Sequence, residues 1–376
     1  MQAVELERKQ GTASSLDDVL AAASERLPRV EIFWLFRAKE RWLAGEIDKA
    51  REILTNAFAA NPNSEAVWLA ASKLEWETGE IERARVLLQR ARERAPAARV
   101  YMKSALLERE EKDFKEALRL IDEGIAKYKT FAKLYMMAGQ ICSDDLPQSK
   151  SNLDRAKKYY QKGLEDCPTN VVLWILASRL EERMSTGVTK ARSLLELARL
   201  KNQKNPELWL EAIRLERRTG NERLASTLMA RALQECPSSG TLLAENIATA
   251  PRVEQKSKSV DAIKRCPEDP HVIGAVASLF AAERKREKAR KWFDRAVSLN
   301  PDLGDSWARY YVFELEHGTK EQQEGVKKRC VTAEPKHGEI WTSIMKLMTN
   351  RRKTISEGIE IVAKEIQKRR EKEPLN

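Results

Sequence analysis

Three histidines are the residues best suited to acid–base catalysis or metal binding in this sequence: His271, His317 and His337. No two of them have the spacing of a helical metal-binding pair, and none belongs to a nucleophile motif. The chain also contains no Gly-rich phosphate-binding loop ending in Lys-Ser or Lys-Thr. We therefore expect a protein that is not an enzyme, with no catalytic residue, no cofactor and no metal site.

The five cysteines point to structural thiols rather than to redox or zinc chemistry. No two of them form a Cys-x-x-Cys pair. Cys167, Cys236 and Cys266 each stand directly before a proline. We interpret them as buried thiols at helix ends, in a reducing compartment.

The elements that carry these residues repeat along the chain. One slot, which we call the anchor, holds a tryptophan or another large apolar residue, mostly at steps of 33 to 35 residues. The anchors are Trp34, Trp68, Tyr101, Tyr135, Trp174, Trp209, Leu243, Ile273, Trp307 and Trp341. A period near 34 residues is typical of a helix–turn–helix repeat.

Each repeat predicts two helices and a shared core. The anchor lies in the first helix, and the second helix carries two small residues seven apart, such as Ala84 and Ala91. Seven residues are two helical turns, so these small residues share one stripe, against which a neighbouring helix can pack closely. One hairpin cannot bury its apolar face alone, but stacked hairpins can. We expect an all-α, right-handed α-α superhelix, or solenoid, of such hairpins.

Composition fits long helices with solvated faces. Charged residues make up 33% of the chain, and 68 basic and 57 acidic residues leave a net charge of +11. A net positive charge is typical of proteins that bind nucleic acid or an acidic partner. However, basic and acidic residues are interleaved along this sequence, so most of them belong to solvated helix faces. No apolar run approaches a membrane span, so we expect no membrane partner.

The repeat pattern predicts four regions. Residues 1–28 form a partial repeat, which suggests a fragment of a longer protein. Residues 29–237 hold regular repeats with a longer turn near 143–152, and residues 238–267 hold a shortened repeat that could bend the solenoid. Residues 268–376 hold the last repeats and a basic tail.

Candidate binding residues follow from the anchor, because first helices normally line the concave surface of such superhelices. The fifth residue after the anchor is basic at Lys39, Lys73, Arg179 and Arg214. The eighth residue is Trp42, Trp76 or Arg217, and Arg218 is ninth. Tryptophan and arginine are frequent in binding hot spots, so we predict these residues as partner contacts. Packing against the adjacent repeat is the alternative for Trp42 and Trp76, and a solvated face is the alternative for the basic row.

One departure from the tetratricopeptide pattern identifies a subfamily. Late in the first helix, where that pattern has an aromatic residue, this chain has Glu75, Glu108, Glu181, Glu216 and Glu314. The second helix often begins with Ala-Arg, as at Ala84-Arg85. These features resemble the half-a-tetratricopeptide (HAT) repeat of RNA-processing factors. We expect the glutamate to pair with the arginine across its own hairpin.

Longer strings narrow the resemblance, among them AERKREKARKWFDRAVSLNPDLGDSWARYYVFELEHGT at 282–319. They resemble the C-terminal part of the pre-mRNA-processing factor 6 family, the HAT/TPR-repeat scaffold of the U5 snRNP. The resemblance implies a nuclear, non-enzymatic scaffold in pre-mRNA splicing. It also implies protein partners in the U5 and U4/U6 snRNPs, which the scaffold bridges in the tri-snRNP. An RNA-binding module and a self-associating module remain alternatives, with RNA contact secondary and a monomer favoured.

Overall fold

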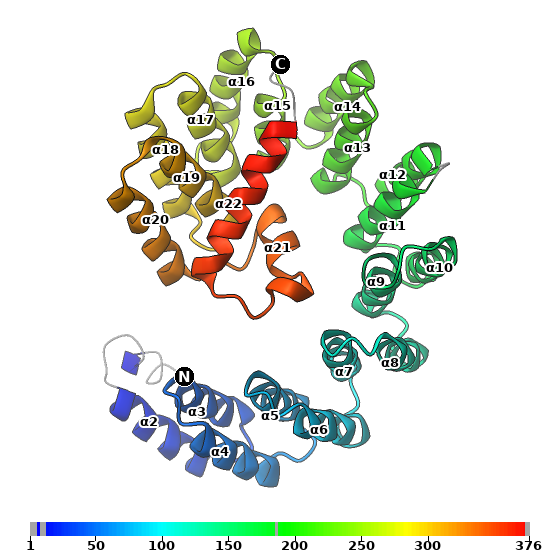
Figure 1. Ribbon diagram of the computed structural model, residues 1–376, viewed down its shortest axis with the longest axis vertical. Helices are drawn as coiled ribbons and strands as arrows, with labels where there is room; N and C mark the ends of the chain where they lie inside the picture. The colour runs from blue at the N-terminus through cyan, green and yellow to red at the C-terminus, as the bar shows by residue number, and fades with distance from the viewer. Residues whose placement is uncertain (1–5, 8–12, 185–186, 373–376) are drawn as a thin grey trace. The chain divides into compact units, whose positions relative to one another are not determined.

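The computed structural model describes residues 6–7, 13–184 and 187–372, and helices dominate them (Figure 1). The chain divides into two compact units, residues 1–184 (unit 1) and 185–376 (unit 2). The predicted all-α hairpin repeat is confirmed in both.

In unit 1, α2 (Ala13–Arg26) is followed by four hairpins and then by α11 (Val171–Arg183), which is the first helix of the next repeat. The hairpins are α3 (Glu31–Leu43) with α4 (Ile47–Ala60), α5 (Glu65–Glu77) with α6 (Ile81–Arg94), α7 (Ala98–Glu110) with α8 (Phe114–Lys127), and α9 (Ala132–Gln140) with α10 (Lys150–Asp166). The first helices, α3 to α11, lie along the inner side of this arc in Figure 1.

Unit 2 begins with α12 and ends with a short helix and a long one. Its elements are α12 (Gly187–Lys201), α13 (Pro206–Arg218) with α14 (Glu222–Glu235), α15 (Gly240–Ala248) with α16 (Arg252–Arg265), α17 (Pro270–Ala282) with α18 (Arg286–Leu299), α19 (Gly304–His317) with α20 (Lys320–Ala333), α21 (Glu339–Met345) and α22 (Ile355–Lys372).

Many helices start at a polar side chain that accepts a backbone hydrogen bond. This capping satisfies N–H groups of the first turn that have no partner within the helix. The capping residues are Ser64, Asp113, Ser149, Asn170, Asn205, Ser239, Asp269 and Thr319.

The turn inside a hairpin has one backbone shape in five repeats. The second residue after the first helix is left-handed, and the N–H that follows it bonds to a carbonyl of the last helical turn. Glycine takes the left-handed position at Gly45, Gly79 and Gly220, with φ of 81°, 87° and 79°. Lys112 and Arg284 adopt it with φ of 65° and 60°, although side chains disfavour that conformation.

The anchor tryptophans combine packing with a hydrogen bond that explains their position six residues after a proline. The indole N–H of Trp34 donates to the carbonyl of Pro28 over 2.9 Å, and Trp307 donates to Pro301 over 2.7 Å. Trp68 and Trp174 make the same bond to Pro62 and Pro168. A buried indole N–H needs an acceptor, and the proline carbonyl at the preceding turn supplies it.

The small stripe of the second helix seats the anchor of its own hairpin. Ala84 and Ala91 are fully buried. A Cβ added at Gly124 would lie 2.9 Å from the Cβ of the anchor Tyr101, and one at Gly163 would lie 2.8 Å from that of Tyr135. Both distances are too short for carbon atoms, so the anchor ring requires a small residue here.

The glutamate–arginine pair forms, but the predicted partner was wrong. Glu75 of α5 binds Arg51 of the preceding hairpin at 2.8 Å, and Arg85 of its own hairpin binds Glu108 of the next. The same step joins Arg192 to Glu216 and Arg290 to Glu314, and Lys157 takes the place of arginine for Glu181. The start of a second helix lies beside the first helix of the following repeat, so these pairs connect neighbouring repeats.

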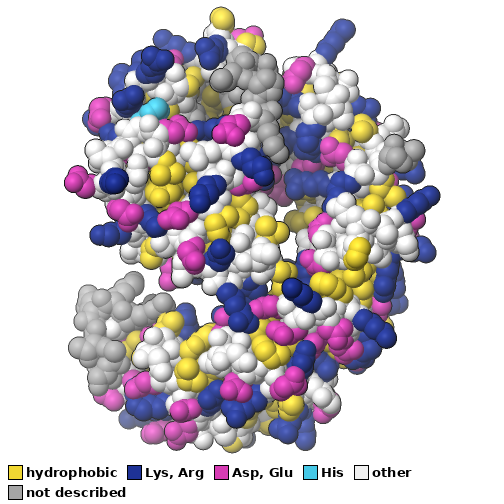
Figure 2. Space-filling view, viewed as in Figure 1, with side chains coloured by type: hydrophobic (Ala, Val, Ile, Leu, Met, Phe, Trp, Pro, Cys, Tyr) yellow, Lys and Arg dark blue, Asp and Glu magenta, His cyan; other side chains and the backbone are white. Residues whose placement is uncertain are grey.

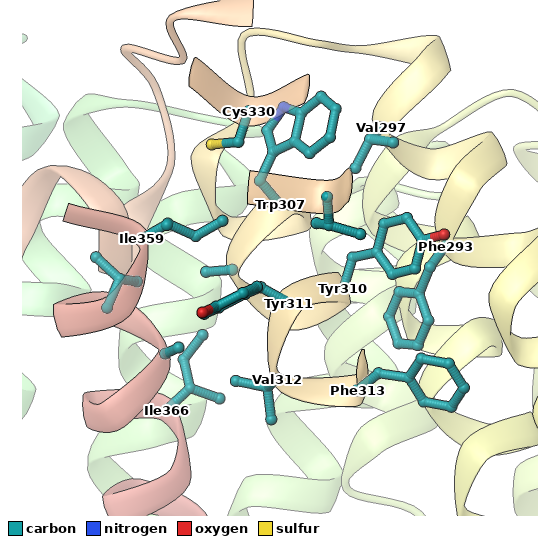
Figure 3. Packing of buried hydrophobic residues seen from close by; sticks show 14 of the residues in the cluster. Phe293, Val297, Trp307, Tyr310, Tyr311, Val312, Phe313, Cys330, Ile359 and Ile366 are labelled. Atoms are coloured by element: carbon teal, nitrogen blue, oxygen red, sulfur yellow. The ribbon is translucent and has the colours of Figure 1, made fainter. Parts of the chain in front are cut away.

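A large core lies at the end of unit 2 and includes α22 (Figure 3). Ile359 and Ile366 of α22 are buried with Tyr311 and Val312 of α19. The buried carboxylate of Asp305 on α19 accepts from the backbone N–H of Glu339, Ile340 and Trp341 at the start of α21. The last helices are thereby fastened to α19.

Two repeats depart from the regular hairpin geometry. After α9, a π-helical turn covers Ile141–Asp145, and α10 begins at Lys150. The shortened repeat results from α15, which has 9 residues against 13 in α13 and α17. In the predicted partial repeat 1–28, α2 is the second helix, whereas residues 1–5 and 8–12 lie outside the described residues. The end of the predicted basic tail, 373–376, also lies outside them.

Candidate partner-binding surface

The first helices of unit 1 contact one another in sequence, α3 with α5, α5 with α7 and α9 with α11. Their shared face is the inner face of the arc (Figure 1). Each second helix packs on its own first helix and on the next one, as α4 packs on α3 and α5. Residues that follow the anchor by one and five positions therefore form rows along the inner face.

An apolar row and a basic row run along this face of unit 1. The residues that directly follow the anchors are apolar and only half-buried: Leu35, Leu69, Met102, Met136 and Ile175. Of the predicted basic row, Lys39, Lys73 and Arg179 are exposed. We call these eight residues the inner groove of unit 1. Half-buried apolar side chains beside exposed cations suit a partner segment with apolar and acidic side chains.

The two predicted tryptophan contacts have different environments. Trp76 is 3% exposed and packs with Ala84, Leu88 and Leu107, so its prediction as a partner anchor was wrong and the packing alternative holds. A residue eight positions after the anchor meets the second helix of its own repeat and the next first helix. Trp42 is only partly buried, and the ammonium of Lys73 lies 5.3 Å from its ring centroid.

The predicted basic residues of unit 2 are occupied by carboxylates of their own chain. Arg214 binds Glu245 of α15 at 2.8 Å and Glu339 of α21 at 2.7 Å. Burial acts to lower the pKa of Arg214, but the two carboxylates outweigh it and the pKa is raised. Arg217 lies 3.5 Å from Glu222, and Arg218 binds the buried Glu211 at 3.0 Å. Arg214 is thus held between two carboxylates of its own unit, whereas Arg217 and Arg218 form partly exposed ion pairs. The role of these three residues as partner contacts stays a prediction.

The histidines occupy separate structural positions. Burial lowers the pKa of His271, the ring of His317 packs edge-on to Phe313, and His337 Nδ1 lies 2.6 Å from Asp302 Oδ2. Across residues 13–184 and 187–372, no three His, Cys, Asp or Glu side chains are placed to hold a metal ion. Over the same residues, no helix is both long and apolar enough to cross a membrane.

The cysteine thiols cap the preceding repeat. Those of Cys167, Cys236 and Cys266 donate to the backbone carbonyls of Lys129, Lys204 and Ser238. Cys167 and Cys236 are buried as predicted, whereas Cys266 is half-buried. Burial raises the pKa of all three thiols. They are structural groups in this fold.

Stacked helical hairpins define a helical-repeat protein of the tetratricopeptide-like class. A family model described as "PRP6, TPR-like domain" matches residues 145–360, which is more than half of the chain. A second model, "Tetratricopeptide repeat", matches residues 41–107. The chain belongs to the PRP6 family.

Curated relatives agree with this assignment. The chain is 43% identical over 237 residues to pre-mRNA-splicing factor prp1 of Schizosaccharomyces pombe, covering 63% of this chain and 25% of that protein. It is 54% identical over 112 residues to human pre-mRNA-processing factor 6, covering 30% of this chain and 12% of that protein. The alignments thus span a quarter or less of these longer relatives.

Among solved structures, yeast Tom70 is similar over 98% of this chain and 95% of its own, with 14% identity and a TM-score of 0.41. This likeness carries no argument about function.

Proposed function

We propose that this chain is a non-enzymatic scaffold of pre-mRNA splicing that binds other splicing proteins through the inner groove of unit 1. The observation that carries the proposal is the pairing of a half-buried apolar row with the exposed Lys39 and Lys73 on the first helices α3, α5 and α7, which contact one another in turn. Membership of the PRP6 family and the names of the relatives, a splicing factor and a processing factor, support the cellular process.

The finer proposal concerns the partners. The scaffold binds proteins of the U5 and U4/U6 snRNPs and bridges the two particles within the tri-snRNP, in the nucleus. Such a partner segment carries acidic residues for Lys39 and Lys73 and apolar residues for Leu35, Leu69 and Met102. A segment that orders on binding could follow several repeats, with a long footprint and a modest affinity per unit area.

The test compares recovery of named snRNP proteins from nuclear extract by the wild-type chain and by a Lys39→Glu, Lys73→Glu variant, with nuclease present. We expect the variant to lose at least tenfold in recovery of U5 or U4/U6 proteins, because the added carboxylates repel an acidic segment. The matched control is Lys115→Glu, Lys162→Glu, which reverses two exposed charges on the second helices α8 and α10. Equal recovery by all three chains would refute the groove as the binding surface.

A further inference from the structure

The segment of unit 2 from α16 to α18 carries a surplus of positive charge. Residues 252–299 contain 12 Lys and Arg and 7 Asp and Glu, a net charge of +5. Dark blue side chains are frequent in Figure 2 over the region that α16, α17 and α18 occupy in Figure 1. A surplus alone says little, because charges on helix surfaces commonly neutralise one another. The distribution of the ion pairs is what distinguishes this region.

Five of the seven acidic side chains of this region form ion pairs with a particular set of cations. Glu254 binds Lys258, Asp261 binds Arg265, and Glu283 binds Lys285, at 3.1, 3.0 and 2.6 Å. Glu287 binds Arg290 at 2.7 Å, and Asp294 binds Arg329 of α20 at 2.7 Å.

Eight other cations of residues 252–299 are exposed and have no ion-pair partner among the described residues. Lys264 and Arg295 lie further along α16 and α18. We call the remaining six the basic edge: Arg252, Lys256, Arg284, Arg286, Lys288 and Lys291.

The fold brings the basic edge together from two helices and a turn. The chain reverses between α16 and α17 and again between α17 and α18, and both pairs of helices are packed together. The start of α16 therefore lies beside the end of α17, where the turn to α18 begins. Lys256 and Lys288 both act on the carboxylate of Glu283 in that turn, and its pKa is lowered, first by the hydrogen bond from Lys285.

Arg284 adds an independent observation, because its backbone conformation favours glycine. It occupies the left-handed turn position with φ of 60°, where Gly45, Gly79 and Gly220 stand in three other repeats. A side chain at that position strains the backbone. Residue 284 nevertheless projects an exposed guanidinium into the basic edge. The fold does not require this charge, since the same turn forms with glycine elsewhere in the chain.

We infer that the basic edge binds the phosphate backbone of single-stranded RNA, independently of base sequence. Cations that the chain leaves unneutralised are what a polyphosphate requires, since binding then releases the counterions of the RNA. Contacts of this kind position a nucleic acid without reading its bases. A protein partner would instead favour aromatic and apolar anchors, such as those in the inner groove of unit 1. The basic edge is separate from that groove in sequence and in chemistry.

The test uses the full 376-residue chain and a fluorescently labelled single-stranded oligouridine, with anisotropy measured over a range of salt concentrations. We expect the variant Lys256→Gln, Arg284→Gly, Lys288→Gln to bind at least tenfold more weakly. The slope of log affinity against log salt should fall in magnitude by about 2, since each phosphate contact with a single strand contributes about 0.7. The matched control is Lys112→Gly, Lys115→Gln, which makes the equivalent turn change in unit 1.

Arg284→Gly alone separates binding from folding. It removes a cation and relieves the left-handed strain, so its thermal stability should equal or exceed that of the wild type while RNA affinity falls. Wild-type affinity in the triple variant, or an equal loss in the Lys112 control, would overturn the inference. Displacement of the RNA by polyglutamate at equal charge concentration would also overturn it, in favour of an acidic protein partner.

Discussion

The fifth residue after the anchor has a different environment in the two units. In unit 1 the fifth residue after the anchor is an exposed cation at Lys39 and Lys73. In unit 2 the equivalent Arg214 is bound by Glu245 and Glu339 of its own chain. Glu339 reaches it because the last helices of unit 2 return toward α13. The same position in the repeat thus forms ion pairs within the chain in one unit and is exposed in the other.

Trp42 and Trp76 show that one repeat position can have different environments within a single unit as well. Trp42 and Trp76 hold the same repeat position, yet Trp76 is core and Trp42 is half-exposed beneath Lys73. Binding residues in a solenoid therefore have to be judged repeat by repeat. The predictions below test the two contrasts, from the largest effect to the smallest.

Replacing an anchor tryptophan by alanine should lower the stability of its own unit only. Trp209 is buried in unit 2, with the guanidinium of Arg199 4.2 Å from its ring centroid. Trp209→Ala should cost about 3–5 kcal/mol, as is usual for a large aromatic core residue. Hydrogen exchange should show lost protection in α12 to α15 and unchanged protection in α3 to α8. Equal loss in both units would mean that they fold as one cooperative block.

The paired tryptophans should differ in stability when each is removed. Trp76→Ala should destabilise unit 1 by about 3–4 kcal/mol, because its cavity lies between two repeats. Trp42→Ala should cost about 1–2 kcal/mol, since its ring is already partly in water. Thermal denaturation of both variants provides the measurement. Similar losses would mean that the two environments are equivalent after all.

Two basic residues at the fifth position after the anchor should have opposite effects when they are replaced. Replacement of Arg214 should lower stability, whereas replacement of Lys73 should weaken partner binding. Arg214→Ala leaves Glu245 and Glu339 without their shared counterion and should cost about 1–2 kcal/mol in a partly buried site. Lys73→Ala should change stability by less than about 0.5 kcal/mol, as is usual for an exposed side chain, and should weaken partner binding. Opening free energies of α13 and α21 from hydrogen exchange measure the first effect. A stable Arg214→Ala chain would remove the distinction between the units.

Mild acid should affect unit 2 alone, because all three histidines follow residue 270. Burial lowers the pKa of His271 below its ordinary value of 6.5, beside the charges of Asp269, Arg309, Asp305 and Glu339. The unfolded chain then takes up a proton that the folded chain refuses. The stability of unit 2 is therefore complete above about pH 6.5 and declines below it.

Hydrogen exchange at about pH 7.5 and about pH 5.5, corrected for intrinsic rates, should show this small decline in α17 and α19. The variant His271→Gln should remove it. A decline of equal size in unit 1 would assign the effect to groups other than His271.

Much of the architecture was predictable because local rules repeat many times. The helical-hairpin repeat, with its anchors and its stripe of small residues, followed from spacing. The bond from four anchor indoles to a proline carbonyl six residues earlier was visible as a spacing, although its cause was not. The glutamate–arginine pairs were expected within a hairpin, and they form between hairpins because the second helix lies against the following repeat.

The sequence by itself determined the repeat, since period, anchors and small residues depend on distances of a few helical turns. Only the tertiary structure decided which members of a repeated position are available to a partner. Arg214 and Glu339 are 125 residues apart, and no local pattern predicts that they meet. The physical reason is cumulative: small differences in repeat length, such as the short α15, add up along the stack and determine which distant helices approach one another.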